Sequence, residues 1–222
     1  MVRHVVWDWN GTLLADTWLM VASANAATAQ YGAAPITVEH WRQIVTRPTA
    51  LTYGIILGKV VTDEDWQRLE VVWLDNYVRN AHRVRMAEGA REALAAVRAL
   101  GLTQSVVSLH DGAALRDHIR ELGVEEYFDA IAGVDEDTPG GQGSAKTNML
   151  AAHLRELGVA PSQVVVIGDV TDDADAARAV GASAILVTCG DTAPERLVDD
   201  GSPLADSLLE AVGLLEPVTS CG

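Results

Sequence analysis

The chain has 222 residues, a length that suits one α/β core with a smaller inserted unit. Its net charge of −15 disfavours nucleic acids and anionic membrane surfaces as main partners, because binding to either requires basic patches. Two cysteines, Cys189 and Cys221, show neither a disulfide framework nor metal-ligand spacing, and no segment is long and apolar enough to span a bilayer. We therefore expect a cytoplasmic protein with no signal peptide and no membrane partner, and its oligomeric state stays open.

The first predicted element is a buried strand at residues 5–7, an apolar run of β-branched and aromatic side chains. Asp8 follows it directly, and Asn10, Gly11 and Thr12 continue the chain into a turn. Open α/β sheets bind ligands at the carboxyl ends of their strands, so Asp8 is a candidate nucleophile or ligand. The alternative is a loop aspartate that caps the next helix.

Residues 16–87 carry apolar side chains at helical spacing and no strand pattern. Helices are predicted at 17–31, 38–46, 50–57 and 63–81, the last behind a cap at Thr62 with an acidic first turn. This shift in composition predicts a helical cap domain at 16–87 and a core domain at 1–15 and 88–222. A helical unit inserted there would lie over Asp8 and control solvent access. Arg47, between two of these helices, is a candidate substrate contact or an ordinary surface arginine.

From residue 88 onward the predicted elements alternate between helix and strand. The predicted helices cover 88–99, 113–122, 144–157, 173–180 and 202–215, and the predicted strands cover 102–107, 130–133, 163–167 and 184–188. Together with the first strand, this order predicts five parallel strands with helices on both faces. The expected fold class is a three-layer, Rossmann-like α/β sandwich with an inserted all-helical unit.

Polar side chains follow the predicted strands at positions that suit chemistry. Ser108 ends the second strand, and Asp169 and Asp173 follow the fourth. Carboxylates that are held together repel one another, so a cluster with Asp8 favours a hard divalent cation with oxygen ligands. The Ser108 hydroxyl and the Lys146 ammonium are donors suited to phosphoryl oxygens. The alternative is that the acidic residues only favour a helix N-terminus and that the two donors are solvated.

Taken together and in this order, these positions resemble the motifs of the haloacid dehalogenase-like hydrolase superfamily. The resemblance is closest to its helical-capped phosphatase branch, which includes phosphoglycolate phosphatase and β-phosphoglucomutase. The first motif of that family, Asp-x-Asp-Gly-Thr, is similar to Asp8-Trp9-Asn10-Gly11-Thr12, and the later motifs are matched by Ser108, Lys146, Gly168, Asp169 and Asp173. The resemblance implies a Mg²⁺-dependent phosphohydrolase that acts on a small phosphorylated metabolite through an aspartyl phosphate on Asp8.

The resemblance also implies a role for each remaining position. The Mg²⁺ ligands would be Asp8, Asp169, Asp173 and the backbone carbonyl of Asn10. Ser108, Lys146 and the backbone N–H groups around Trp9, Gly11 and Thr12 would hold the transferring phosphoryl oxygens. The Trp9 side chain, next to Asp8, is a candidate for the lining of the pocket, and burial alone is the alternative. Arg47 and His110 would contact the substrate, and His110 could also replace a missing acid; a solvated loop histidine is the alternative.

Asn10 departs from the family pattern, which has an aspartate that protonates the leaving group and then activates water. An amide cannot do this work, and the loss of such a group typically costs on the order of 10²–10⁴ in rate. Asn10 therefore keeps open a non-catalytic phosphate-binding or sensor protein on the same fold. A metal-independent haloacid dehalogenase, in which Asp8 would attack carbon, is a third alternative that the three strand-end carboxylates disfavour.

Overall fold

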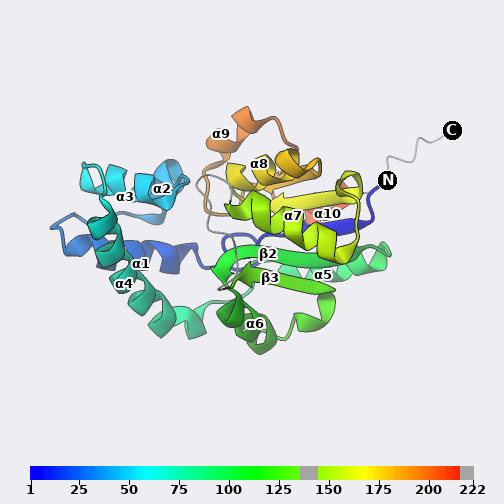
Figure 1. Cartoon of the computed structure of the whole chain (residues 1–222), viewed down its shortest axis with the longest axis horizontal. Helices are drawn as coiled ribbons and strands as arrows, with labels where there is room; N and C mark the ends of the chain where they lie inside the picture. Colours follow the sequence, from blue (N-terminus) through cyan, green and yellow to red (C-terminus); the bar gives the residue numbers. More distant parts are fainter. Residues whose placement is uncertain (136–144, 216–222) are drawn as a thin grey trace.

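A six-stranded parallel sheet forms the centre of the molecule, with its strands in the order β3-β2-β1-β4-β5-β6. The computed structural model describes residues 1–135 and 145–215, so residue 144 of one expected helix and the C-terminal residues 216–222 lie outside the described parts. The strands are β1 His4–Trp7, β2 Thr103–Asp111, β3 Ala130–Val134, β4 Val164–Gly168, β5 Ser183–Val187 and β6 Leu204–Ala205. Figure 1 shows β1 and its neighbours inside the molecule, between layers of helices.

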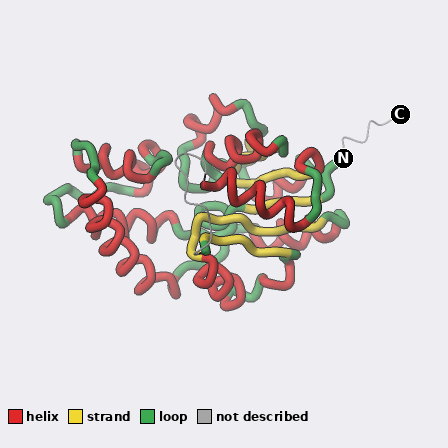
Figure 2. Tube along the Cα trace, viewed as in Figure 1, coloured by secondary structure: helices red, strands yellow, loops and turns green. Residues whose placement is uncertain are grey.

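Helices cover both faces of this sheet (Figure 2). Val5 and Trp7 of β1 point to one face and pack with residues of α5, α6 and α10, whereas Val6 points to the other and packs with α7 and α8. This alternation is the two-residue period of a strand buried on both sides. The helices are α5 Ala90–Ala99, α6 Gly112–Glu121, α7 Ala145–Leu157, α8 Thr171–Val180, α9 Pro194–Leu197 and α10 Leu208–Gly213. The expected three-layer α/β class is confirmed.

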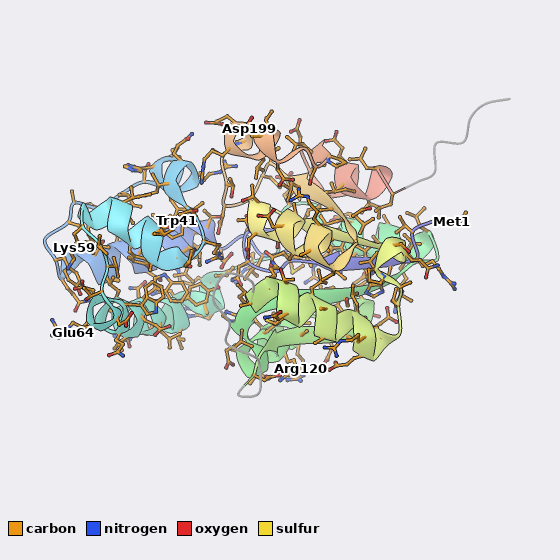
Figure 3. All side chains as sticks on the ribbon, turned by 45° about the horizontal axis from the view of Figure 1, so that its top comes forward. Met1, Trp41, Lys59, Glu64, Arg120 and Asp199 are labelled. Atoms are coloured by element: carbon orange, nitrogen blue, oxygen red, sulfur yellow. The ribbon has the colours of Figure 1, made fainter. Side chains whose placement is uncertain are left out.

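Four α-helices are inserted between β1 and α5: α1 Thr17–Ala29, α2 Val38–Ile44, α3 Thr49–Leu57 and α4 Asp63–Asn80. We call residues 16–87 the helical insertion. It has its own buried cluster, which includes Trp41, Tyr53 and Leu69, and it lies at one end of the sheet (Figure 1). Figure 3 shows Lys59 and Glu64 at the far end of the insertion and Met1 at the opposite end of the molecule. The division of the chain into two domains at these residues stays a prediction.

Two features of the described chain differ from the sequence prediction, one near its C-terminus and one in β2. The expected helix at 202–215 is wrong over its first half, where β6 pairs with β5 and the helix begins only after Ser207, whose side chain caps α10. A strand of two residues leaves no alternating pattern for sequence reasoning to detect. The second predicted strand is also longer than expected, because β2 continues to Asp111 with an irregular register after Val107. His110 therefore lies in a strand rather than in a loop.

None of the helices in the described ranges is long and apolar enough to cross a membrane.

Two buried histidines meet at one serine inside the core. His4 Nε2 lies 2.8 Å from Ser105 Oγ, and His153 Nε2 lies 2.7 Å from the same atom. The exposed fractions of the two histidines are 1% and 4%. A hydroxyl can donate to one neutral imidazole and accept from another, so this arrangement suits two uncharged rings. Burial is the main reason that the pKa of His4 is lowered to about 4.

This histidine pair predicts a pH-dependent stability. Between pH 6.5 and about 4 the unfolded chain binds a proton on His4 that the folded chain does not bind, so the free energy of unfolding should fall by about 2–3 kcal/mol as the pH drops through that window. Urea denaturation at several pH values measures the slope. His4→Gln should flatten it, and His40→Gln, at an exposed position of α2, should leave it unchanged. If the free energy of unfolding of His4→Gln fell as steeply with falling pH as that of the unaltered protein, His4 would not be the cause of the pH dependence.

Candidate active site

The carboxyl ends of the neighbouring strands β1 and β4 bring the acidic residues of the sequence motifs together. Trp7, the last residue of β1, pairs with Val106 of β2 and Ile167 of β4, and Asp8 N donates to Ile167 O at 2.9 Å. Asp8, Asp169 and Asp173 each offer a carboxylate oxygen, and these oxygens lie within 4.8 Å of one another. All three side chains are buried, with exposed fractions of 7%, 1% and 0%.

Lys146 is the cation of this cluster. It lies in the first turn of α7, and its Nζ forms ion pairs with Asp8 Oδ1 and with Asp173 Oδ1. Both contacts are buried, so they are weakly screened by solvent. One ammonium among three carboxylates leaves an uncompensated negative charge when all three are ionised.

Asp169 is held from two sides in a narrow space. Its Oδ1 accepts from Thr12 Oγ1 at 2.7 Å, and its Oδ2 accepts from Asp191 N at 2.5 Å. Gly11, at φ +76°, passes so close that a Cβ there would lie 2.5 Å from Asp169 Oδ2, and this approach requires glycine. The Gly11-Thr12 pair of the first motif thus positions Asp169.

Burial raises the pKa values of these carboxyl groups when no cation is present. The pKa of Asp8 is raised to about 7 by burial, although Lys146 lowers it, and the pKa of Asp169 is raised to about 8 by burial and by Asp191. Hard oxygen donors with excess negative charge fit a divalent cation such as Mg²⁺. Such a cation would reduce the repulsion between the carboxylates and would favour their ionised forms.

Asp191 is a fourth buried carboxylate that the sequence reasoning missed. It follows β5, accepts from Thr17 Oγ1 at 2.5 Å, and has a pKa raised to about 7 by burial and by the nearby Asp16. A usable signal was present, because a Gly-Asp pair, Gly190-Asp191, stands shortly after an apolar strand, as Gly168-Asp169 stands at the end of another.

Asn10 contacts Ser108, one of the two donors of the predicted site. Its Oδ1 accepts from Ser108 Oγ at 3.4 Å, and its Nδ2 donates to Asp16 Oδ2 at 2.7 Å and to Tyr77 OH at 3.0 Å. Neither Asp16 nor Tyr77 was singled out from the sequence. Both are buried, with exposed fractions of 0% and 2%.

A cavity of about 530 Å³ lies next to this cluster, between the helical insertion and the core. The lining residues with polar groups include Arg47 and Thr49 from the insertion and Lys146, Asp172 and Arg196 from the core. Arg47 is exposed, and its Nη1 donates to Thr49 Oγ1 at 2.5 Å. The structure therefore brings Arg47 and Lys146 to the walls of one cavity from two distant parts of the sequence.

Three predicted substrate contacts lie elsewhere. The Trp9 indole does not line the cavity, because it is fully buried in the core and lies edge-on to His118 at 6.0 Å. The N–H groups of Gly11 and Thr12 donate to Leu14 O and Trp9 O within their own turn, and the Thr12 hydroxyl is occupied by Asp169. In the described ranges, the N–H groups of Trp9 and Asn10 have no acceptor.

His110 is half-buried and does not line this cavity, although its neighbour Leu109 does. Its ring is 5.8 Å from the Tyr77 ring, and its backbone N–H donates to Ser108 Oγ at 3.2 Å. Burial lowers the pKa of its imidazole. In this arrangement His110 orients the Ser108 hydroxyl through its backbone, and its role as a substrate contact stays a prediction.

Three features of this site are typical of a hydrolase with an α/β core. They are a carboxylate after the first strand of a parallel sheet, further carboxylates from the end of a neighbouring strand, and a lysine that pairs with them. The family model for haloacid dehalogenase-like hydrolases matches residues 5–187, and the chain belongs to this family. The resemblance inferred from the motifs is thereby confirmed.

The comparisons with individual proteins agree with this assignment. The chain is 26% identical to phosphoglycolate phosphatase from Chromobacterium violaceum, over 85% of this chain and 86% of that protein. It is also 26% identical to N-acetylmuramic acid 6-phosphate phosphatase from Pseudomonas aeruginosa, over 87% and 85% of the two chains. The solved structure of the haloacid dehalogenase-like hydrolase SP0104 from Streptococcus pneumoniae superposes with a TM-score of 0.83 at 16% identity, over 97% of this chain and 99% of that one, which supports the fold.

Proposed function

We propose that the chain is a Mg²⁺-dependent phosphohydrolase that removes phosphate from a small phosphorylated metabolite through an aspartyl phosphate on Asp8. The observation that carries the proposal is the buried cluster of Asp8, Asp169 and Asp173 with Lys146, beside a cavity that Lys146 also lines. The two phosphatases with which the chain shares most of its length favour a phosphate monoester as the substrate. We further propose that the helical insertion acts as a cap and that the protein works in the cytoplasm.

The residues divide the chemistry as follows. Asp8 Oδ attacks phosphorus, the bond from phosphorus to the ester oxygen breaks, and the leaving oxygen takes a proton from water because Asn10 has none to give. Lys146, Ser108 and the N–H groups of Trp9 and Asn10 hold the phosphoryl oxygens. Mg²⁺, when bound by Asp8, Asp169, Asp173 and the Asn10 carbonyl, supplies positive charge against the developing phosphoryl charge. Water then attacks phosphorus and releases phosphate from Asp8, and we expect this step to be slow.

The experiment that tests the proposal is the pre-steady-state release of p-nitrophenol from p-nitrophenyl phosphate, with Mg²⁺ and with EDTA. This leaving group scarcely needs an acid, so the first turnover reports attack by Asp8 and the later rate reports hydrolysis of the phosphoenzyme. We expect a burst that is stoichiometric with the protein and requires Mg²⁺. Release that is unaffected by EDTA would contradict the role of the cation and would favour metal-independent chemistry at Asp8.

A phosphate-binding or sensor protein is the second candidate, and Asn10 is the observation that favours it. Such a protein would bind phosphorylated metabolites without a burst. Calorimetry with the same compounds and Mg²⁺ separates the two candidates, because tight binding without any p-nitrophenol release supports the sensor.

Arg47 is predicted to select substrates that carry a second anionic group. Arg47→Ala should raise the KM for a phosphorylated carboxylic acid such as phosphoglycolate by about 10-fold with a smaller change in kcat, because it removes one charge-assisted contact from the wall of the cavity that Lys146 also lines. The KM for p-nitrophenyl phosphate, which has no second anion, should stay unchanged. Arg68→Ala, at an exposed position of the same insertion, is the matched control. Equal KM values for both substrates in Arg47→Ala and in the unaltered protein would exclude the contact.

A further inference from the structure

Asp16 is a buried carboxylate that neutral groups alone satisfy in the described parts of the chain. Its side chain has an exposed fraction of 0%. Asp16 Oδ2 accepts from Asn10 Nδ2 at 2.7 Å and from Tyr77 OH at 2.7 Å, and Oδ1 accepts from Gly11 N at 2.9 Å. Within residues 1–135 and 145–215, no lysine, arginine or histidine forms an ion pair with it. Burial raises the pKa of Asp16, whereas its hydrogen bonds with Asn10, Tyr77 and Gly11 lower it, so the ionised form of Asp16 depends on these donors.

These donors also fix the direction of the Asn10 amide. A carboxylate can only accept, so the nitrogen of the amide must face Asp16 and the oxygen must face the other way. The oxygen, Oδ1, accordingly lies on the side of Ser108, whose hydroxyl donates to it at 3.4 Å. Asn10 therefore presents an acceptor, and no proton, to the side of the site where Ser108 lies.

An aspartate at position 10 would not fit beside Asp16. It would remove the two N–H donations from position 10 and would place a second carboxylate about 3 Å from the first in a partly buried place, where like charges repel more strongly than in water. We propose that Asn10 and Asp16 are a matched pair, in which the carboxylate at position 16 requires an amide at position 10 and, with Tyr77, holds the Asn10 oxygen toward the reacting phosphate. The part about the reaction rests on the proposed function.

Tyr77 makes this pair depend on the helical insertion. It belongs to α4, and its ring stacks on Trp73 at 4.9 Å with an interplanar angle of 17°. Its hydroxyl donates to Asp16 and accepts from Asn10. Asp16 and Tyr77 are thus positioning residues for Asn10, whose oxygen can orient the water that attacks the phosphoenzyme but cannot deprotonate it.

Exchange of the two side chains tests the pair. The variants are Asn10→Asp, Asp16→Asn, the double variant with both changes, and Tyr77→Phe. Asn10→Asp alone should lower the thermal midpoint by several degrees. The double variant should recover most of this loss, because the amide introduced at position 16 can donate to the carboxylate introduced at position 10 while its oxygen accepts from Gly11 N. Asn25→Asp, which changes an amide of α1 that bonds to Ile36, is the control; its loss should simply add to that of Asp16→Asn.

The burst experiment gives a measurement that would not change if Asp16 and Tyr77 only stabilised the fold. Asp16→Asn and Tyr77→Phe should keep the p-nitrophenol burst, and the later steady rate should fall at least several-fold, because Asn10 is then free to turn. The double variant should raise the steady rate above that of the unaltered protein by on the order of 10-fold or more, because it restores a carboxyl group at position 10 in a compatible setting.

Two results would overturn the pairing. One is an Asn10→Asp variant as stable as the unaltered protein; the other is stability losses of Asn10→Asp and Asp16→Asn that merely add. Both are measured without catalysis. The absence of a burst in every protein, with non-additive stability, would refute the proposed function and leave the pair standing.

Discussion

Asp8→Asn should lose the p-nitrophenol burst completely and lower the steady rate of phosphate ester hydrolysis by at least about 10³-fold, because an amide cannot form the acyl phosphate bond. The fold should survive this change. Lys146 keeps its ion pair with Asp173, and the asparagine side chain is close in size to the aspartate that it replaces. The measurement is stopped-flow absorbance with Mg²⁺ present, together with a thermal midpoint for each protein.

Asp199→Asn is the control for Asp8→Asn, because it makes the same chemical change at an exposed position (Figure 3). It should keep both the burst and the steady rate. A stoichiometric burst in Asp8→Asn would show that another group attacks phosphorus, and the assignment of Asp8 would then be wrong.

Lys146→Met should destabilise the fold as well as stop the reaction. Removal of the ammonium leaves Asp8 and Asp173 without their shared partner in a buried cluster, and breaking such a pair typically costs about 3–5 kcal/mol. The loss should grow with pH. Burial raises the pKa of Asp8 in the folded protein, and Lys146 opposes this rise, so the pKa of Asp8 should be higher still in Lys146→Met. The folded variant then keeps a proton on Asp8 to a higher pH than the unaltered protein does, whereas the unfolded chains have both released it, so the variant loses more stability as the pH rises toward 8.

Urea denaturation at pH 6 and pH 8.5, with Mg²⁺ or with EDTA, measures this effect. Mg²⁺ should restore part of the stability of Lys146→Met, because a cation that binds only the folded state stabilises it. Lys59→Met, which removes a lysine from an exposed ion pair with Asp65, should change little in any of the four conditions. The same loss with Mg²⁺ and with EDTA would mean that the cluster does not take up the cation.

Most of the fold could be predicted because its signals are local. The strands with continuous apolar runs, such as those that end at Trp7 and Ile167, have no competing interpretation when glycine-ended helices separate them. The parallel order then brings Asp8 and Asp169 to one edge of the sheet without further information. β6 was not predicted, because its two residues gain their strand conformation from pairing with β5 rather than from their own sequence.

The candidate site was predictable only in the residues that follow strands. Arg47 and Lys146 were assigned to one site by resemblance, and their shared cavity depends on how the insertion sits on the core. The direction of the Trp9 side chain and the partners of the Gly11 and Thr12 N–H groups depend on the turn itself. Tyr77 could not have been found, because it lies 61 residues from Asp16 along the chain and meets it through tertiary packing.

Lys59 and Lys146 are the two lysines of the sequence, and their surroundings make them unequal targets for covalent labelling. The Lys146 amine is buried and ion-paired on two sides, whereas the Lys59 side chain has an exposed fraction of 42% at the far end of the insertion (Figure 3). An amine-reactive fluorophore should therefore modify Lys59 much faster than Lys146 in the native protein. A dye at Lys59 would report movements of the insertion without an engineered cysteine, and slow acylation at Lys146 would register each opening of the site to solvent.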